Sequence, residues 1–274
     1  MSTPLGEFLR ARRQLMTVDQ VGLTRVGGRR RTPGLRREEI AMLAGLSADY
    51  YARLEQGRDV NPSDQVLAAL ARVFQLCPDA TEYLYKLARP RACVEGVVPC
   101  VDQVSLCVLR FIEKWDDASV FVVNRRLDIL AKNRVAAALF EGVDYTDNLI
   151  RLAFLNPAAR EWWLNWEEEA AENVAHLRAA AGTDPDDPYL LELVDELSRE
   201  SEDFRRLWAR HDVRGRNQGL IRLHHSEVGE MTFSLETLRI ESAPGLRILV
   251  AEAVPRGPAD DCLAKLRVLT ASRR

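Results

Sequence analysis

The side chains best suited to chemistry in this sequence are arginines that gather near its start. Residues 1–37 carry nine arginines, no lysine and only two acidic residues, which gives this stretch a net charge of +7. A guanidinium group binds phosphate oxygens through parallel hydrogen bonds, so such a cluster is typical of nucleic-acid binding. Pro33 and Gly34 keep the densest part out of a helix, free to follow a phosphate backbone. The arginines predicted to hold phosphates or enter a groove are Arg29, Arg30, Arg31, Arg36 and Arg37. The alternative is a solvated basic loop.

Two short amphipathic segments follow these arginines and would position them. In the first, Ile40, Leu43 and Ala44 fall at helical spacing, and a glycine at position 45 ends the pattern. In the second, apolar residues at 46, 51 and 54 form one face, and Ser47 is placed to cap the helix. Two short helices joined by a glycine-containing turn predict a helix-turn-helix, and residues 47–56 would be the recognition helix. The alternative is an ordinary helical hairpin.

The recognition helix would present its outward side chains to base edges in the DNA major groove. With Tyr51 and Leu54 turned toward the core, those facing outward, together with the cap, are Ser47, Ala48, Asp49, Tyr50 and Arg53. Tyr50 and Arg53 are the predicted base readers, because a guanidinium can donate two hydrogen bonds to guanine.

Charge and length divide the chain into two domains. Residues 1–92 carry 15 basic and 10 acidic side chains, whereas the remaining 182 residues carry 23 and 31. A basic first part followed by an acidic second part indicates that only the first domain binds phosphate groups. A chain of 274 residues with 47% hydrophobic residues suffices for two domains with real cores. We expect a DNA-binding domain over residues 1–91, a linker over 92–103 and a second domain over 104–274.

The first domain is predicted to be all-helical. A helix capped by Thr3 or Ser2 should run to about Leu15, and a polar insertion over 17–34 separates it from the helix-turn-helix. Helices over 63–74 and from Pro78 to about Ala88 complete a five-helix, repressor-type domain.

The first domain also carries a resemblance. The stretches LGEFLRARR (5–13), RRRTPGLRREE (29–39) and YYARLEQGR (50–58) resemble the MmyB-like regulators, a branch of the XRE (Cro/phage-repressor) helix-turn-helix family. The similarity continues into the second domain and covers nearly the whole chain.

The second domain changes pattern from helical to mixed. We expect a helix over 104–115, strands over 119–124 and 127–131, a helix from Asn133 to Phe140, further helices up to His211, and three strands over 219–224, 230–240 and 246–254. A hairpin, a helical insert and three antiparallel strands resemble a PAS-type sensor. The fold class is therefore an all-α helix-turn-helix domain followed by an α+β PAS-like domain with an antiparallel sheet.

The resemblance implies that the second domain holds a small apolar molecule, with a fatty acid as the leading suggestion. Large apolar side chains on helices could form the walls: Phe154, Trp162, Trp163, Trp166, Phe204 and Trp208. The sheet could supply the floor through Phe233, Leu235, Leu238, Ile248 and Val250. Plain core packing is the alternative for the aromatic residues. An acidic lipid also needs a cationic or hydrogen-bonding anchor at the pocket mouth, for which Arg210, His211 and Arg214 are the candidates. Arg210 could instead pair with Asp212.

Other chemistry finds little support. Cys93, Cys100 and Cys107 recur every seven residues, but Gly96 and Pro99 break any helix between the first two, and a thiol sensor is the weaker interpretation. The chain contains no CxxC pair, nucleophile elbow, HExxH sequence or phosphate-binding glycine loop, and no metal site is expected.

The remaining ionisable groups also have ordinary interpretations. His176 and the acidic clusters at 167–169 and 184–187 are expected on the surface, and a haem-ligand role for His211 has no second signal. His224 and His225 would point to opposite faces of a strand, which suits no shared metal. No segment resembles a signal peptide or a membrane span, so the protein is expected in the cytoplasm, away from membranes.

The sequence therefore predicts a non-enzymatic transcription regulator with no certain cofactor. It would bind double-stranded operator DNA as a homodimer and sense a small apolar ligand, such as a bound fatty acid, in its PAS-like domain. The alternative is a DNA-binding regulator whose second domain only dimerises or recruits a protein partner.

Overall fold

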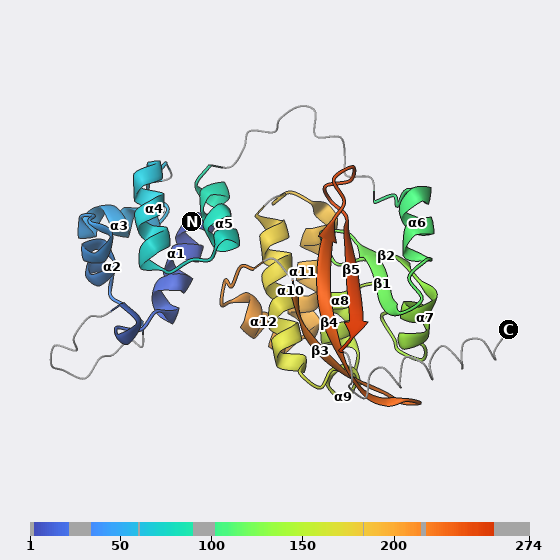
Figure 1. Cartoon of the computed structure of the whole chain (residues 1–274). Helices are drawn as coiled ribbons and strands as arrows, with labels where there is room; N and C mark the ends of the chain where they lie inside the picture. Colours follow the sequence, from blue (N-terminus) through green and yellow to red (C-terminus); the bar gives the residue numbers. More distant parts are fainter. Residues whose placement is uncertain are drawn as a thin grey trace.

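The fold is that of a computed structural model, and it divides into a helical N-terminal region and a mixed C-terminal region (Figure 1). The structure describes residues 3–21, 34–59, 61–89, 102–182, 184–214 and 218–254. Residues 92–101 of the linker expected at 92–103, with Cys93 and Cys100, lie outside these residues.

The N-terminal region contains the five predicted helices. They are α1 (Pro4–Leu15), α2 (Arg37–Ala44), α3 (Ala48–Glu55), α4 (Asp64–Val73) and α5 (Pro78–Ala88), with a short 3-10 helix at Asp19–Val21. Side-chain oxygens cap three of them as predicted, because Thr3, Ser47 and Ser63 each accept a hydrogen bond from a first-turn backbone N–H. Buried apolar side chains from all five helices form one core around Phe8, Leu9, Ile40, Tyr51, Leu54, Leu70 and Leu84.

The C-terminal region is built on a five-stranded antiparallel sheet. Its strands are β1 (Ala118–Val123), β2 (Ile129–Lys132), β3 (Gln218–His225), β4 (Gly229–Arg239) and β5 (Arg247–Ala253), in the spatial order β2-β1-β5-β4-β3. The helices are α6 (Leu106–Ile112), α7 (Arg134–Leu139), α8 (Leu149–Leu155), α9 (Ala159–Trp162), α10 (Trp166–Ala181), α11 (Pro188–Glu200) and α12 (Glu202–Trp208). This arrangement confirms the predicted α+β domain with its hairpin, helical insert and three closing strands.

Both faces of the sheet are covered where β1 runs, and all six residues of that strand are buried. One face packs against α7 to α12 in the larger core, which contains Phe121, Phe233 and Leu249. The other face packs against α6 through Ile112, Val120 and other apolar residues. In Figure 1, α10 and α12 lie on the side of the sheet toward the N-terminal helices, and α6 lies on the far side.

Asn133 joins the hairpin to α7 through four side-chain hydrogen bonds. Its Oδ1 accepts from the backbone N–H of Val120 and of Ala136, at 3.1 and 2.9 Å. Its Nδ2 donates to the carbonyls of Trp115 and Ala118, at 2.8 and 2.9 Å. The side chain is 1% exposed, so water cannot replace these bonds. The predicted helix cap is therefore also a bond between α7 and β1.

Two surface predictions were wrong. His176 is buried, because α10 packs against α5, α8 and α12 rather than lying on the surface, and its Nδ1 is 3.2 Å from Nη1 of Arg247. Glu169 of the acidic cluster is buried on the same helix. The surrounding charges had made α10 resemble a solvated helix. No helix in the described ranges is long and apolar enough to cross a bilayer.

Replacing Asn133 by Ala should lower the free energy of unfolding of the C-terminal region by about 3 kcal/mol, because buried N–H and C=O groups lose their partners. Urea denaturation followed by tryptophan fluorescence measures this. Ser105→Ala is the control: it removes an exposed cap of α6 and should cost about 1 kcal/mol. Equal costs for the two variants would contradict the assigned role of Asn133.

Candidate nucleic-acid interface and ligand cavity

The turn between α2 and α3 has the geometry that the sequence pattern required. Gly45 ends α2 with φ of 68°, a left-handed conformation that glycine adopts without strain. Ser47 then starts α3, and its Oγ accepts a hydrogen bond from the N–H of Tyr50 at 3.1 Å. The two helices form the predicted helix-turn-helix.

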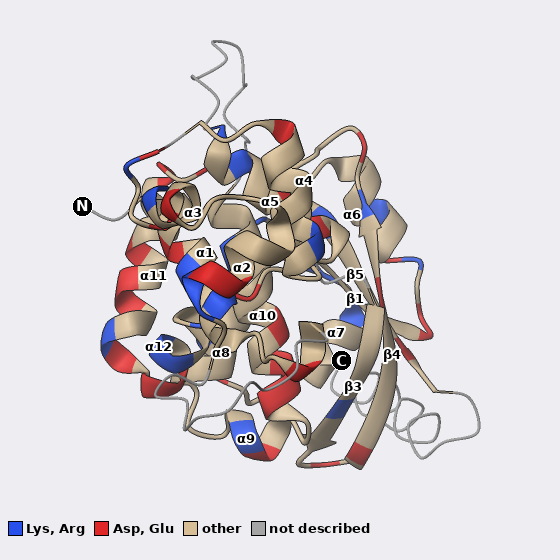
Figure 2. Cartoon of the chain, turned by 90° about the vertical axis from the view of Figure 1, so that its left-hand side faces the viewer, with Lys and Arg blue, Asp and Glu red and all other residues tan. Residues whose placement is uncertain are grey.

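A single buried carboxylate holds this motif to α1. Glu55, fully buried at the end of α3, accepts hydrogen bonds from Arg13 of α1, with both distances 2.8 Å, and from Arg37 of α2 at 3.0 Å. Arg10 lies 3.7 Å from the same carboxylate. Burial by itself raises the pKa of Glu55, but the hydrogen bonds from Arg13 and Arg37 outweigh it, and the net shift of the pKa is downward. Figure 2 shows basic and acidic segments adjoining where α1, α2 and α3 meet.

The predicted phosphate-binding arginines fall into different places. Arg29, Arg30 and Arg31 lie outside the described residues. Arg36 is exposed at the start of α2, whereas the guanidinium of Arg37 is engaged by Glu55. The structure thus gives Arg37 a partner within the protein that the sequence did not indicate.

The predicted base-reading residues are at the surface of α3. Ala48 and Asp49 are exposed, and Tyr50 is half-buried beside the core. Arg53 forms an ion pair with Asp49, one helical turn earlier, and its guanidinium carbon lies 5.6 Å from the centroid of the Tyr50 ring. The side chain of Arg53 therefore lies along α3, and its ion-pair partner is the exposed Asp49.

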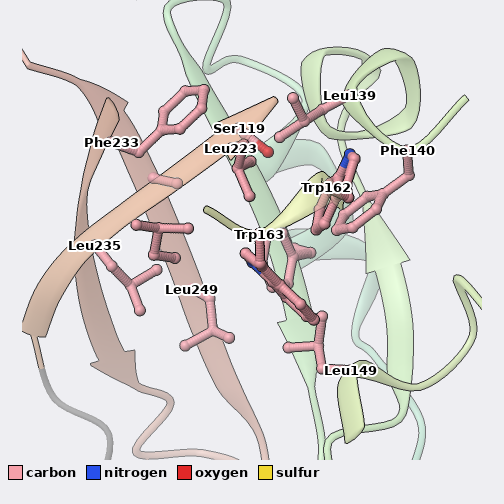
Figure 3. Close-up of a pocket in the computed structure, with 13 residues that line it drawn as sticks. Ser119, Leu139, Phe140, Leu149, Trp162, Trp163, Leu223, Phe233, Leu235 and Leu249 are labelled. Carbon is pink, nitrogen blue, oxygen red and sulfur yellow. The ribbon is translucent and has the colours of Figure 1, made fainter. Parts of the chain in front are cut away.

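A small apolar cavity lies between the sheet and the helices of the C-terminal region (Figure 3). Its volume is about 30 Å³, room for about one or two water molecules. The lining comes from the inner face of β1, β3, β4 and β5 and from the helical insert: Ser119, Phe121, Leu139, Phe140, Leu149, Trp162, Trp163, Ile221, Leu223, Phe233, Leu235, Leu249 and Ala251.

Of the predicted wall and floor residues, Trp162, Trp163, Phe233 and Leu235 line this cavity. Ile248 and Val250 instead belong to the core on the opposite face of the sheet. The other four aromatic residues form a separate stack between α8, α10 and α12. Phe204 lies 5.5 Å from Trp208 and 5.4 Å from Phe154, and Phe154 lies 5.8 Å from Trp166. The core-packing alternative describes these four side chains in the structure.

The predicted anchor residues are not at the cavity mouth. Arg210 pairs with Asp212 at 2.9 Å, which was the stated alternative, and Arg214 pairs with Glu172 at 2.8 Å. Nδ1 of His211 lies 3.3 Å from Nη1 of Arg178. The one polar lining residue, Ser119, was not identified from the sequence, and neither was Lys132, which lies beside the lining. Nζ of Lys132 lies 5.8 Å from the centroid of the cavity-lining Phe140 ring. Strand alternation places Ser119 on the same face as Phe121, a signal that could have identified it.

Asp212 and Val213 instead contact the helix-turn-helix domain. Nη1 of Arg12 in α1 is 3.0 Å from Oδ1 of Asp212. Val213 is 3% exposed and belongs to the core of the N-terminal domain, and its carbonyl lies 3.6 Å from Sγ of Cys77. The segment after α12 therefore docks the two domains on each other.

The comparisons with known families agree with this architecture. Residues 4–84 match a helix-turn-helix domain family, and residues 104–266 match the MmyB-like transcription regulator ligand binding domain. No curated protein matches the chain. The fold and the two sites thus define a DNA-binding transcription regulator with a ligand-binding domain, which is not an enzyme. The chain belongs to the MmyB-like transcription regulators.

No group of metal-ligating side chains occurs within the described part of the chain.

Replacing Glu55 by Ala should lower the free energy of unfolding of the helix-turn-helix domain by about 3–5 kcal/mol, because Arg13 is left buried without its counter-charge. Asp49→Ala, which removes an exposed partner, should change it by less than about 1 kcal/mol. Because the pKa of Glu55 is lowered in the folded state, its contribution is present above its ordinary pKa and is lost as the pH falls through the folded value. Thermal unfolding followed by circular dichroism over acidic pH tests both statements; an acid-insensitive wild type would refute the second.

Proposed function

We propose that this protein is a sequence-specific, homodimeric transcription regulator of the cytoplasm, whose C-terminal domain senses a small apolar ligand. The observation that carries the DNA-binding part is the exposed face of α3, held in place by buried Glu55. The observation that carries the ligand part is the apolar cavity between sheet and helices.

On DNA, the N-terminal half of α3 would enter the major groove with Ser47, Ala48, Asp49, Tyr50 and Arg53. Arg53 would exchange Asp49 for a base edge, since an exposed ion pair contributes little to stability. Arg36, and from the sequence also Arg29, Arg30 and Arg31, would bind phosphates. Arg37 would support DNA binding indirectly, by holding Glu55 in place, or would bind a phosphate with the half-exposed side of its guanidinium. A dimer would place two such helices in successive major grooves.

In the cavity, an alkyl chain is the chemistry that the lining accepts best. The space of about 30 Å³ is too small for a fatty acid, so leucine side chains such as Leu139, Leu149 and Leu249 must shift to admit it. A carboxylate would then find its cation in Lys132, whose Nζ lies 5.8 Å from the centroid of the Phe140 ring. This assigns to Lys132 the anchoring role first expected of Arg210, His211 and Arg214.

The ligand signal would reach the DNA through α1. Arg12 binds Asp212 of the ligand-binding domain, whereas the next residue, Arg13, binds Glu55 of the recognition helix. Trp163 lines the cavity, and the stack of Phe154, Trp166, Phe204 and Trp208 extends from its neighbourhood to the 211–214 segment. A ligand that separates the insert from the sheet would thus change how the two domains dock.

The small size of the cavity favours the second candidate, in which this domain only dimerises or recruits a protein. Denaturing extraction of the purified full-length protein, followed by mass spectrometry, decides between the two. A stoichiometric acyl chain supports the sensor. If calorimetry shows that neither fatty acids nor other apolar probes bind, the domain serves only to dimerise or to recruit a protein.

Arg53→Ala should cost about 1–3 kcal/mol of discrimination for the preferred operator and leave most non-specific binding. Arg36→Ala is the matched control, which should weaken binding to all sequences and lower the salt slope by about one. Selection of the operator from random DNA, then titration over a salt series, gives both quantities. An unchanged operator preference in Arg53→Ala would mean that the recognition residues are misplaced.

Acidification should loosen the docking of the two domains. Burial, together with Arg178 and Arg12, lowers the pKa of His211 from its ordinary 6.5 to about 4. Separation removes Arg12 and part of the burial, so the separated state binds a proton at higher pH. Docking is thus fully favourable above about pH 6.5 and weakens as the pH falls from there toward 4. Small-angle X-ray scattering of the full chain should show a larger radius of gyration at about pH 5 than at about pH 7.

His211→Asn is the control for this pH effect. His211 has φ of 51°, a conformation that asparagine tolerates, so the backbone is retained while the titrating group is removed. The variant should lose the pH dependence; if it expands on acidification like the wild type, another group is responsible.

A further inference from the structure

Two of the residues that line the cavity of the ligand-binding domain carry a buried polar atom without a hydrogen-bond partner. Ser119 is the one hydroxyl-bearing residue among the thirteen that line it, and every other lining side chain is aliphatic or aromatic. Ser119 is fully buried, and its Oγ makes no hydrogen bond. Nε1 of Trp162, a second lining residue, is likewise buried without a partner. Figure 3 shows the Ser119 oxygen turned toward the side of the cavity where Leu139 and Trp162 lie.

Packing does not explain these two groups. Ser119 lies on β1 opposite Ala251 and shares the inner face with Phe121, so alanine would fill the position without burying a hydroxyl. Buried polar groups in native proteins nearly always have a partner, because an unsatisfied donor carries its full desolvation penalty. Two such groups around one cavity indicate that their partner is a molecule that enters it.

The chemistry of the two groups defines what they would recognise. An indole N–H can only donate a hydrogen bond, and a serine hydroxyl with no nearby donor donates as well. The complementary ligand atom is therefore an acceptor. No cationic or anionic side chain lines the cavity, so a charged acceptor there would be desolvated without a counter-charge. The acceptor is an uncharged oxygen.

We propose that the ligand of this domain is an apolar molecule with an uncharged oxygen acceptor, such as a ketone, ester or lactone, which receives hydrogen bonds from Ser119 and Trp162. The inference rests on the proposed ligand-sensing function and narrows it. A simple fatty acid carries its only oxygens in the carboxylate, which would lie outside at Lys132. Its alkyl chain would leave both donors unpaired.

The test compares three probes of equal chain length on the purified full-length protein: methyl nonyl ketone, undecanoic acid and undecane. Isothermal titration calorimetry gives the affinities, and thermal unfolding gives an independent measure. The ketone should bind about three- to tenfold more tightly than the alkane, the effect of a net hydrogen bond. Ser119→Ala should reduce this preference, because it removes one of the two donors, and should leave alkane binding unchanged.

Ser119→Ala also gives a readout without any ligand. Because it removes an unsatisfied buried hydroxyl, the ligand-free variant should have a higher melting temperature than the wild type. Trp162→Phe should likewise reduce the ketone preference. Trp163→Phe is its matched control, since Trp163 lines the same cavity but its indole nitrogen is not one of the buried donors without a partner.

The outcomes separate the two proposals. If the three probes bind equally and Ser119→Ala changes nothing, the donors serve only a buried water and the inference is wrong, while ligand sensing stands. Tighter binding of undecanoic acid than of the ketone, unaffected by Ser119→Ala, would also overturn the inference and support a fatty acid. If none of the three probes binds, both the inference about the uncharged acceptor and the proposed ligand sensing are wrong.

Discussion

The DNA-binding half of this protein depends on one ionic interaction, the buried carboxylate of Glu55 between Arg13 and Arg37. A carboxylate without exposure to water persists only with opposite charges and hydrogen bonds around it, and here they come from two other helices. Glu55 consequently fixes α1, α2 and α3 relative to one another. The arginines therefore divide into two groups, because those around Glu55 build the motif, whereas Arg36 and Arg53 make no contact with Glu55 and lie nearer the surface.

The ligand-binding half is held together by apolar packing, with a sheet that separates two apolar cores. The core under α6 contains Ile112, Val120 and Val250, and the larger core retains a small space bounded by leucines and aromatic rings. Asn133 supports both, because its side chain joins the first strand to the helix that contributes Leu139 to the lining. The cavity therefore sits on a rigid hairpin on one side and on a helical insert of separate short helices on the other.

Much of the fold could be predicted from the sequence, because local signals sufficed. Caps such as Ser47 and Asn133, the turn at Gly45 and strand alternation each act within a few residues. The candidate site was harder, since tertiary packing decides it. The pattern around Trp208 and Arg210 indicates an amphipathic helix end, but not that this end contacts α1 instead of a ligand. His176 was misplaced for the same reason. Nothing in the sequence tells whether the hydroxyl of Ser119 has a partner.

The burial of Val213 has a consequence for modularity. Although residues 1–91 resemble a self-contained repressor domain, part of their hydrophobic core is supplied from more than a hundred residues further along the chain. An excised DNA-binding fragment would expose an unfilled apolar site between α1 and α5. Chimeras that graft this helix-turn-helix onto another sensor would need to carry the 211–214 segment or repack that site, so the two halves are expected to evolve as a pair.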